Sequence, residues 1–298
     1  LQFKPKNLTV VDINENGLTE LTRDLRSSNL LDYDPEYITY PVNLLSETFE
    51  KIFKLKKWQV VANFSAHKHV RSEKDVISVE ALIKNNVFGA IKLLSLCESK
   101  PPNFFFSVST DKAANPVNIM GASKNLMEKL ILSKKNIFRV STARFANVAF
   151  SNGSLLDGFV YRLEKKQPLS CPSDIKRFFV TPEQSGQICL LSTFLGESGN
   201  IFFPKLDFHK DQIFFKDIAI DFLKENNFKP FISKSENEAK EFNFHKNSDY
   251  YPIYFFETET SGEKTYEEFY TESEDYIIDE YDSLGFIKSS EKTILFKE

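Results

Sequence analysis

Hydrophobic positions in the first half of the chain follow two alternating periods, one typical of strands and the other of amphipathic helices. Short apolar or β-branched runs predict strands at 8–12, 37–40, 58–63, 103–108 and 137–144, with the strand at 58–63 buried. Between these runs, apolar residues at helical spacing predict helices at 18–26, 44–56, 78–98 and 120–133. This alternation indicates an α/β fold with a doubly wound parallel sheet.

The pattern changes beyond residue 150, where the predicted elements become shorter and polar turns more frequent. Helices are expected near 182–194 and 215–226, followed by an acidic, aromatic-rich C-terminal stretch. We therefore divide the chain into a sheet domain, residues 1–150, and a smaller lobe, residues 151–298, mixed with returning elements of the sheet.

Composition narrows the classes of partner. The 298 residues include 38 basic and 42 acidic side chains, a balance that lacks the basic excess of nucleic-acid-binding proteins. No apolar run approaches the roughly 18 residues of a membrane span, and no secretion signal is visible at residue 1. Cys97, Cys171 and Cys189 are widely spaced, which is typical of a reducing compartment. We expect a cytoplasmic protein whose partners are small molecules or proteins.

A candidate for acid–base chemistry follows the predicted strand 103–108. There Asp111 and Lys112 adjoin Ser109 and Thr110, at the carboxyl edge where ligands bind in parallel sheets. A carboxylate beside an amine can act as an acid–base pair, although a solvated turn remains the alternative. A little further along, Met120 and Lys124 share one face at the start of a predicted helix, four positions apart.

The run from Val108 to Lys124, Val-Ser-Thr-Asp-Lys-Ala-Ala-Asn-Pro-Val-Asn-Ile-Met-Gly-Ala-Ser-Lys, resembles a known signature. It is similar to that of extended short-chain dehydrogenase/reductases acting on nucleotide sugars, specifically the UDP-N-acetylglucosamine 4,6-dehydratases of the polysaccharide-biosynthesis group. Met120 stands where most of these proteins carry the Tyr of Tyr-x-x-x-Lys, as in one branch that includes soluble forms for legionaminic-acid-type synthesis. Segments 63–70, 143–148, 175–181 and 261–267 extend the likeness over nearly the whole chain.

The resemblance implies a Rossmann domain at residues 1–150 that binds NAD. An acid at the end of the second family strand accepts bonds from the adenine ribose and disfavours NADP; Asp12 occupies that place, although a turn or helix-capping role remains open. The implied cofactor-binding residues are Asp12, Ser65, Ala66, Lys124 and Val148. The chain contains no G-x-G-x-x-G motif, so the family's first strand and Gly-rich loop are missing from this sequence. We expect them upstream of Leu1, the alternative being a truncated remnant.

The implied reaction oxidises C4 of the sugar, eliminates water across C5 and C6, and returns the hydride to C6. The implied catalytic residues are Asp111, Lys112, Thr110, Met120 and Lys124. Lys112 is expected to be the base at C5, and Asp111 the acid for the departing hydroxyl. Because a thioether has no ionisable proton, Met120 cannot accept the proton of the C4 hydroxyl, and a water held by Thr110 is one candidate.

The resemblance also places residues around the UDP-sugar substrate, namely Lys68, Asn147, Arg177 and Glu263. Arg177 has a structural alternative as a salt bridge within the smaller lobe. His67 and His69 have no carboxylate at ligand spacing, so no metal site is expected.

Related proteins form homodimers or higher homo-oligomers through a pair of helices, here 78–98 and 120–133. Val87, Ile91, Met127 and Ile131 fit such an interface but equally fit the core. A nucleotide-sugar epimerase and a non-catalytic remnant that binds UDP-sugar remain the alternative functions.

Overall fold

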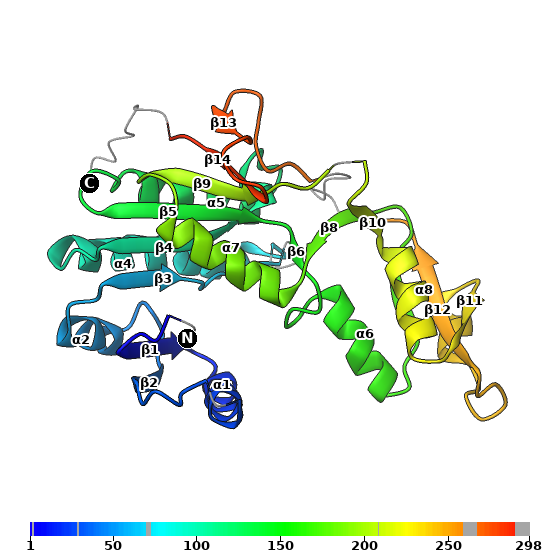
Figure 1. Ribbon diagram of the computed structural model, residues 1–298. Coiled ribbons are helices and arrows are strands. Elements are labelled where there is room, and N and C mark those ends of the chain that lie inside the picture. Colours follow the sequence, from blue (N-terminus) through cyan, green and yellow to red (C-terminus); the bar gives the residue numbers. More distant parts are fainter. Residues whose placement is uncertain (2, 29, 70–72, 208, 259–266, 290–298) are drawn as a thin grey trace.

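A six-stranded sheet forms the centre of the larger part of the molecule (Figure 1). The computed structural model describes residues 1, 3–28, 30–69, 73–207, 209–258 and 267–289. The strand order is β13-β14-β9-β5-β4-β3, with bounds Tyr276–Ile277, Leu284–Ile287, Asn200–Pro204, Arg139–Phe145, Phe104–Thr110 and Val60–Asn63. Strands β3, β4, β5 and β9 are parallel, whereas β14 and β13 are antiparallel additions. The doubly wound parallel sheet is therefore present.

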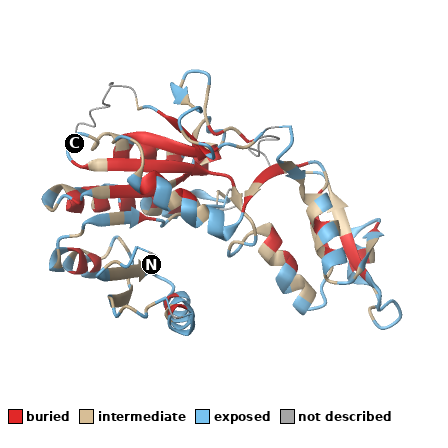
Figure 2. Ribbon diagram, in the orientation of Figure 1, coloured by how far each residue is buried: buried red, intermediate tan, exposed pale blue. Residues whose placement is uncertain are grey.

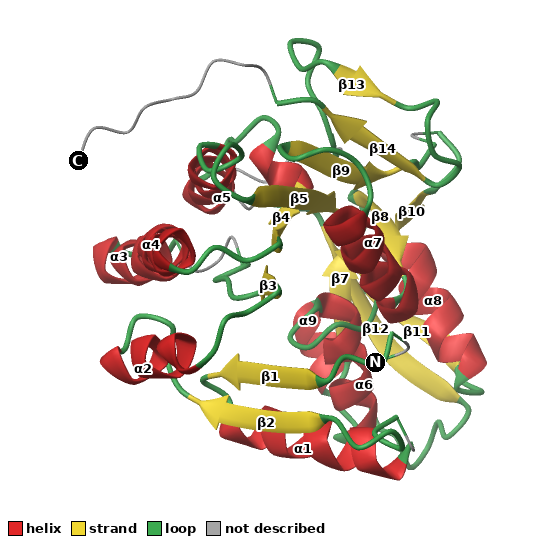
Figure 3. Cartoon of the chain, turned by 60° about the vertical axis from the view of Figure 1, so that its left-hand side comes forward, coloured by secondary structure: helices red, strands yellow, loops and turns green. Residues whose placement is uncertain are grey.

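Strands β1 (Asn7–Asp12) and β2 (Glu36–Pro41) form a separate parallel pair joined by helix α1 (Glu15–Ser27). Among the described residues, β1 pairs only with β2, and β3 pairs only with β4. Figure 3 shows β1 and β3 on either side of an interval that no described strand fills. The expectation of a buried strand at 58–63 is wrong for this reason: β3 is an edge strand, Val60 is 42% exposed, and only Asn63 is buried.

Helices cover both faces of the main sheet (Figure 1). Side-chain caps begin most of them; for example, Asn118 accepts a bond from the Gly121 amide at the start of α5. The predicted helix 78–98 is three consecutive segments, α3, η2 and α4, of which η2 is a π-helix. The bounds are α2 Glu47–Leu55, α3 Val76–Ile83, η2 Lys84–Phe88, α4 Gly89–Ser99, η3 Asp111–Ala113, α5 Ile119–Leu132 and α7 Pro182–Phe194.

The two faces of the sheet bury two apolar clusters, because successive side chains of a strand point to opposite sides. On β4, Phe105 packs with α2, α4 and α5, and Phe106 packs with α7, β9 and β14. Val87, Met127 and Ile131 lie in the first cluster, so the core alternative holds for these three residues, whereas Ile91 is 39% exposed.

A smaller lobe lies beside the sheet, around a third apolar cluster (Figures 1 and 2). Its main sheet has the order β11-β12-β7, and a second sheet, β10-β8-β6, leads into it. The bounds are β6 Asn147–Val148, α6 Leu155–Glu164, β7 Leu169–Pro172, β8 Lys176–Val180, β10 Gln212–Phe214, α8 Phe215–Glu225, β11 Lys229–Ser233, α9 Glu236–Lys240 and β12 Tyr250–Phe256. None of the helices in the described ranges is both long enough and apolar enough to span a membrane.

Candidate active site

The end of β4 carries a hydrogen-bonded group of three consecutive residues. The Lys112 ammonium donates to both carboxylate oxygens of Asp111, at 3.0 and 3.1 Å, and the Thr110 hydroxyl donates to Asp111 Oδ1 at 2.7 Å. Parallel pairing of β4 with β5 extends to Thr110 opposite Phe145 and fixes this end of the strand. Asp111 is buried, so the structure excludes the solvated-turn alternative. An acid and a base are thus held in contact at the carboxyl edge of the sheet.

Helix α5 brings Met120 and Lys124 to the same edge, where both are buried. The Lys124 ammonium donates to the carbonyl of Val108 at 3.1 Å, on the strand that precedes the acid–base pair. Burial lowers the pKa of Lys124 to about 8, against the opposing effect of the Glu128 carboxylate. The four-residue spacing read from the sequence therefore corresponds to two side chains that point inward from one helix turn.

Glu267 is a site residue that the sequence analysis did not single out. Its buried carboxylate accepts bonds from the Asn147 side-chain amide at 2.6 Å and from the Phe178 backbone amide at 2.7 Å. Glu267 Oε1 also lies 4.0 Å from the Lys112 ammonium and 3.7 Å from Arg177 Nε. The only sequence signal was its place at the end of the segment 261–267, which matched the family.

A buried arginine fixes the segment that follows Glu267. Arg144, on β5, makes a two-point contact with Glu128 of α5 at 3.0 and 2.8 Å, and another with Glu274 at 2.9 and 2.8 Å. It also donates to the carbonyl of Phe269 at 2.9 Å. This network attaches residues 269–274 to the sheet and to the helix that carries Lys124.

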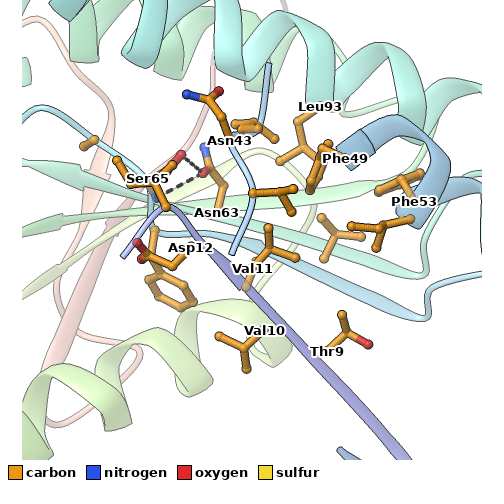
Figure 4. Close-up of a pocket in the computed structure, with 18 of the residues that line it drawn as sticks. Thr9, Val10, Val11, Asp12, Asn43, Phe49, Phe53, Asn63, Ser65 and Leu93 are labelled. Atoms are coloured by element: carbon orange, nitrogen blue, oxygen red, sulfur yellow. Dashed lines mark hydrogen bonds between the residues drawn. The ribbon is translucent and has the colours of Figure 1, made fainter. Parts of the chain in front are cut away.

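A cavity of about 580 Å³ lies between β1 and β3, along the interval that no described strand fills, and side chains of α2 also line it (Figure 4). Of the predicted cofactor residues, Asp12, Ser65 and Ala66 line it, whereas Lys124 and Val148 are not among its lining residues. Asp12 accepts a bond from the Asn14 amide at 2.8 Å, so its turn role is present alongside its place at the cavity. The Ser65 hydroxyl donates to Asn63 Oδ1 at 2.7 Å. The structure thus brings three of the five predicted cofactor residues together.

The loop that carries Ser65 and Ala66 is held by Asn86, a buried residue of the π-helix η2. The Asn86 side chain accepts from the His67 amide at 2.8 Å and donates to the His67 carbonyl at 3.1 Å and to Ser123 Oγ at 3.0 Å. π-Helical segments occur frequently at functional sites, and here the segment joins the loop to α5. Sequence periodicity cannot distinguish such a segment from an ordinary helix.

The predicted substrate residues do not all lie together. Asn147 and Arg177 both contact Glu267. Arg177 is buried and forms a salt bridge with Glu267, which is the structural alternative to a substrate contact. Lys68 donates to the carbonyl of Asn152 at 2.8 Å. Glu263 lies outside the described residues. The described part of the chain contains no group of three His, Cys, Asp or Glu side chains able to hold a metal ion.

Solved structures whose strands and helices are arranged as in this chain identify the class of its fold. Pen from Bacillus thuringiensis matches with a TM-score of 0.76 and 22% identity, covering 98% of this chain and 83% of that one. DesIV, a dTDP-glucose 4,6-dehydratase from Streptomyces venezuelae solved with NAD bound, matches with a TM-score of 0.60 and 14% identity, covering 87% and 86%. The fold is that of the extended short-chain dehydrogenase/reductases, a Rossmann class that includes nucleotide-sugar dehydratases and epimerases.

The family model described as "Polysaccharide biosynthesis protein" matches residues 1–288, and the chain belongs to this family. An uncharacterized membrane protein of Methanocaldococcus jannaschii is 32% identical over 213 residues, covering 69% of this chain and 61% of the relative. The inverting UDP-N-acetylglucosamine 4,6-dehydratase of Campylobacter jejuni is 32% identical over 132 residues, covering 42% and 39%. The chain therefore matches only part of the length of these curated relatives.

Proposed function

We propose that this protein is an NAD-dependent UDP-N-acetylglucosamine 4,6-dehydratase, which forms a UDP-4-keto-6-deoxy-N-acetylhexosamine for bacterial surface glycans. The observation that carries the proposal is the contact of Asp111 with both Thr110 and Lys112 at the carboxyl edge of the sheet. Elimination of water needs a base and an acid near adjacent carbons, and these side chains supply both. The family membership, which is that of polysaccharide biosynthesis proteins, supports the same assignment.

The adenosine end of NAD is proposed to bind at the end of the cavity that Asp12, Ser65 and Ala66 line. Asp12 is an exposed carboxylate at a strand end, and its position suits a ribose diol while repelling a 2′-phosphate, which favours NAD over NADP. No glycine lines the cavity in the described part of the chain, so these residues do not provide the Gly-rich cradle that pyrophosphate usually occupies. When bound, NAD supplies reversible hydride transfer, first from C4 of the sugar and finally to C6.

The side chains of this chain then perform the proton transfers. With the C4 ketone in place, one proton passes from the Lys112 ammonium to the Asp111 carboxylate. Neutral Lys112 then removes the proton from C5, and protonated Asp111 donates a proton to the oxygen on C6, which leaves as water. Lys112 returns a proton to C5 when C6 becomes a methyl group. The proton released from the C4 hydroxyl restores Asp111, so that one water leaves per turnover and the proton balance closes.

Met120 occupies the family tyrosine position and holds no exchangeable proton. Thr110 already donates its hydroxyl proton to Asp111, and its oxygen faces the Lys112 amide at 3.4 Å. A water on Thr110 would connect the C4 hydroxyl to Asp111, the group that requires the proton. Lys68, Asn147, Arg177 and Glu263 remain the proposed substrate contacts, and Val148 and Lys124 the proposed contacts on the nicotinamide side of the cofactor.

We further propose that the protein acts in the cytoplasm, as a homodimer or higher homo-oligomer. The exposed apolar side chains of Ile77, Phe88 and Ile91, on consecutive helical segments, support an interface of this kind.

Proton NMR of UDP-N-acetylglucosamine in D₂O tests the assignment, using the protein expressed with its natural coding sequence and with added NAD. A new 6-methyl signal with deuterium at C5 is expected. A changed sugar that keeps its 6-hydroxymethyl group would instead identify a C4 epimerase, and an unchanged sugar with folded, nucleotide-bound protein would identify a non-catalytic binder. Coupling constants at C5 report whether its configuration is retained or inverted.

A further inference from the structure

The Glu267 carboxylate lies close to three side chains that have different roles in the proposed function. Glu267 Oε1 faces the Lys112 ammonium at 4.0 Å, the Asn147 amide at 2.6 Å and Arg177 Nε at 3.7 Å. These residues come from three separate elements, η3, β6 and β8. The Glu267 side chain is 2% exposed, so solvent does not weaken these interactions.

We propose that Glu267 is a positioning residue of the active site, which shares the Lys112 ammonium with Asp111 and so orients the Lys112 side chain. The inference rests on the proposed function, because only there do Lys112 and Asp111 have their roles as base and acid. Glu267 itself is assigned no contact with substrate and no proton transfer to it.

The surroundings of Glu267 explain why its charge responds to the pair. Burial and, next, the Asp111 charge raise the pKa of Glu267 to about 7, against the opposing effects of Lys112, the Phe178 amide and Arg177. The charged groups that face it are thus Asp111 and Lys112 from η3 and Arg177 from β8. Two carboxylates that share one ammonium cannot ionise independently, because each repels the charge of the other.

The position of Glu267 is imposed from outside the site. Phe269, two positions further along the chain, is held through its carbonyl by Arg144, and Arg144 is itself fixed by Glu128 and Glu274. The backbone amide of Phe178 fixes the other oxygen of the Glu267 carboxylate. A carboxylate held in this way can orient the ammonium of Lys112, which lies at the end of a flexible four-carbon side chain.

The first test follows Glu267 directly, by ¹³C NMR of protein labelled at the glutamate carboxyl carbon. The signal is identified by its loss in Glu267→Gln and is expected to titrate near pH 7 in the unmodified protein. In Asp111→Asn its midpoint should move to lower pH, and in Lys112→Ala to higher pH, since these variants remove charges of opposite sign. Midpoints that stay unchanged in both variants would overturn the coupling.

The second test measures turnover of UDP-N-acetylglucosamine with NAD. Glu267→Gln is expected to lower kcat about tenfold to 10²-fold, because a displaced Lys112 loses alignment with C5. In the unmodified protein kcat should rise through about pH 7 as Glu267 ionises. This rise should be absent from Glu267→Gln and partly restored in Glu267→Asp, which keeps the charge.

Glu98→Gln is the control, because Glu98 forms an ion pair with Lys134 at 2.7 Å and belongs neither to the Arg144 network nor to the group around Lys112. It should retain both kcat and the rise near pH 7. Normal kcat in Glu267→Gln, or an equal loss of kcat in Glu98→Gln, would show that Glu267 does not position Lys112.

The two tests separate the inference from the proposed function. If the unmodified protein forms no 6-methyl product, the proposed function fails, and the NMR titration still decides whether Glu267 is coupled to the pair. If the product forms while Glu267 titrates independently of Asp111 and Lys112, the inference fails and the proposed function stands. Should Glu267→Gln not fold, loss of the signal in Glu267→Asp identifies it instead, and the titrations in Asp111→Asn and Lys112→Ala decide the question with Glu267 intact.

Discussion

The cavity between β1 and β3 and the group around Asp111, at the carboxyl end of β4, are built differently. At the cavity, Asp12 bonds with Asn14 and Ser65 with Asn63, each two positions apart, and Asn86 holds the loop at His67 from 19 positions away. Around Asp111, bonds join distant segments, and Glu267 is 120 positions from Asn147 and 89 from Phe178. Asp111 and Glu267 are also buried, whereas the cavity opens along edges of β1 and β3 that pair with no described strand.

The two regions therefore depend on different parts of the fold. Locally bonded turns keep their shape whether or not a ligand is present, because their contacts arise within a few residues. A buried cluster of charges persists only while every distant partner is in place, since an unpaired buried charge is costly. Substitutions at the acid–base group should therefore have large effects, and substitutions at the cavity should have smaller effects confined to cofactor binding.

The largest effect is expected from Asp111→Asn and Lys112→Ala, which should each reduce turnover by about 10² to 10⁴-fold by removing an acid or a base. Affinity for NAD, measured by fluorescence titration, should stay nearly unchanged, because neither residue lines the cavity. Lys54→Ala removes a lysine of an exposed ion pair and is the matched control. Turnover above a tenth of normal in both variants would contradict the assignment.

Arg144→Ala should have the next largest effect, lowering the free energy of unfolding by about 3–5 kcal/mol because it leaves the buried Glu128 carboxylate unpaired. Urea denaturation measures the change. Arg23→Ala removes a fully surface-exposed pair with Glu20 and should cost less than about 1 kcal/mol. Equal losses of stability in the two arginine variants would mean that the buried Arg144 network stabilises the fold no more than a surface ion pair does.

Lys124→Met tests the cost of a buried ammonium through pH. In the folded state the pKa of Lys124 is lowered to about 8 from its ordinary 10.5, so the folded protein releases this proton first. The stability of the unmodified protein, relative to Lys124→Met, is therefore lowest below pH 8 and rises between about pH 8 and 10.5, by about 3 kcal/mol in total. Urea denaturation of both proteins across this range measures the difference, and a difference that does not vary with pH would argue against a buried charge at Lys124.

The smallest effect is expected at the cavity. Asp12→Ala should weaken NAD binding by about tenfold, equivalent to about 1.4 kcal/mol, and narrow the preference for NAD over NADP by removing a charge that repels a 2′-phosphate. Titration with each cofactor measures this ratio, and Asp24→Ala, on the exposed surface of α1, is the control. If the ratio of NAD affinity to NADP affinity did not change in Asp12→Ala, Asp12 would have only its role in the turn.

Much of the fold follows from short-range features. Helix α7 has the predicted bounds, Pro182–Phe194, because a Thr181–Gln184 capping box and a proline define its first turn. Asp111 and Lys112 were identified because they are adjacent and follow a strongly apolar strand. In each case the controlling interactions lie within a few residues, where sequence patterns are informative.

The alternation of strands and helices and the adjacency of Asp111 and Lys112 after a strand follow from the sequence, since each depends on neighbouring residues. Only the tertiary structure decided that Val87, Met127 and Ile131 face the core, that β3 is an exposed edge, and that Glu267 joins Lys112. A helix face or strand edge is buried only by what packs against it, and that partner is distant in sequence. The charge of Glu267 likewise depends on groups about 90 to 155 positions away, which meet only when the sheet and the C-terminal segment pack together.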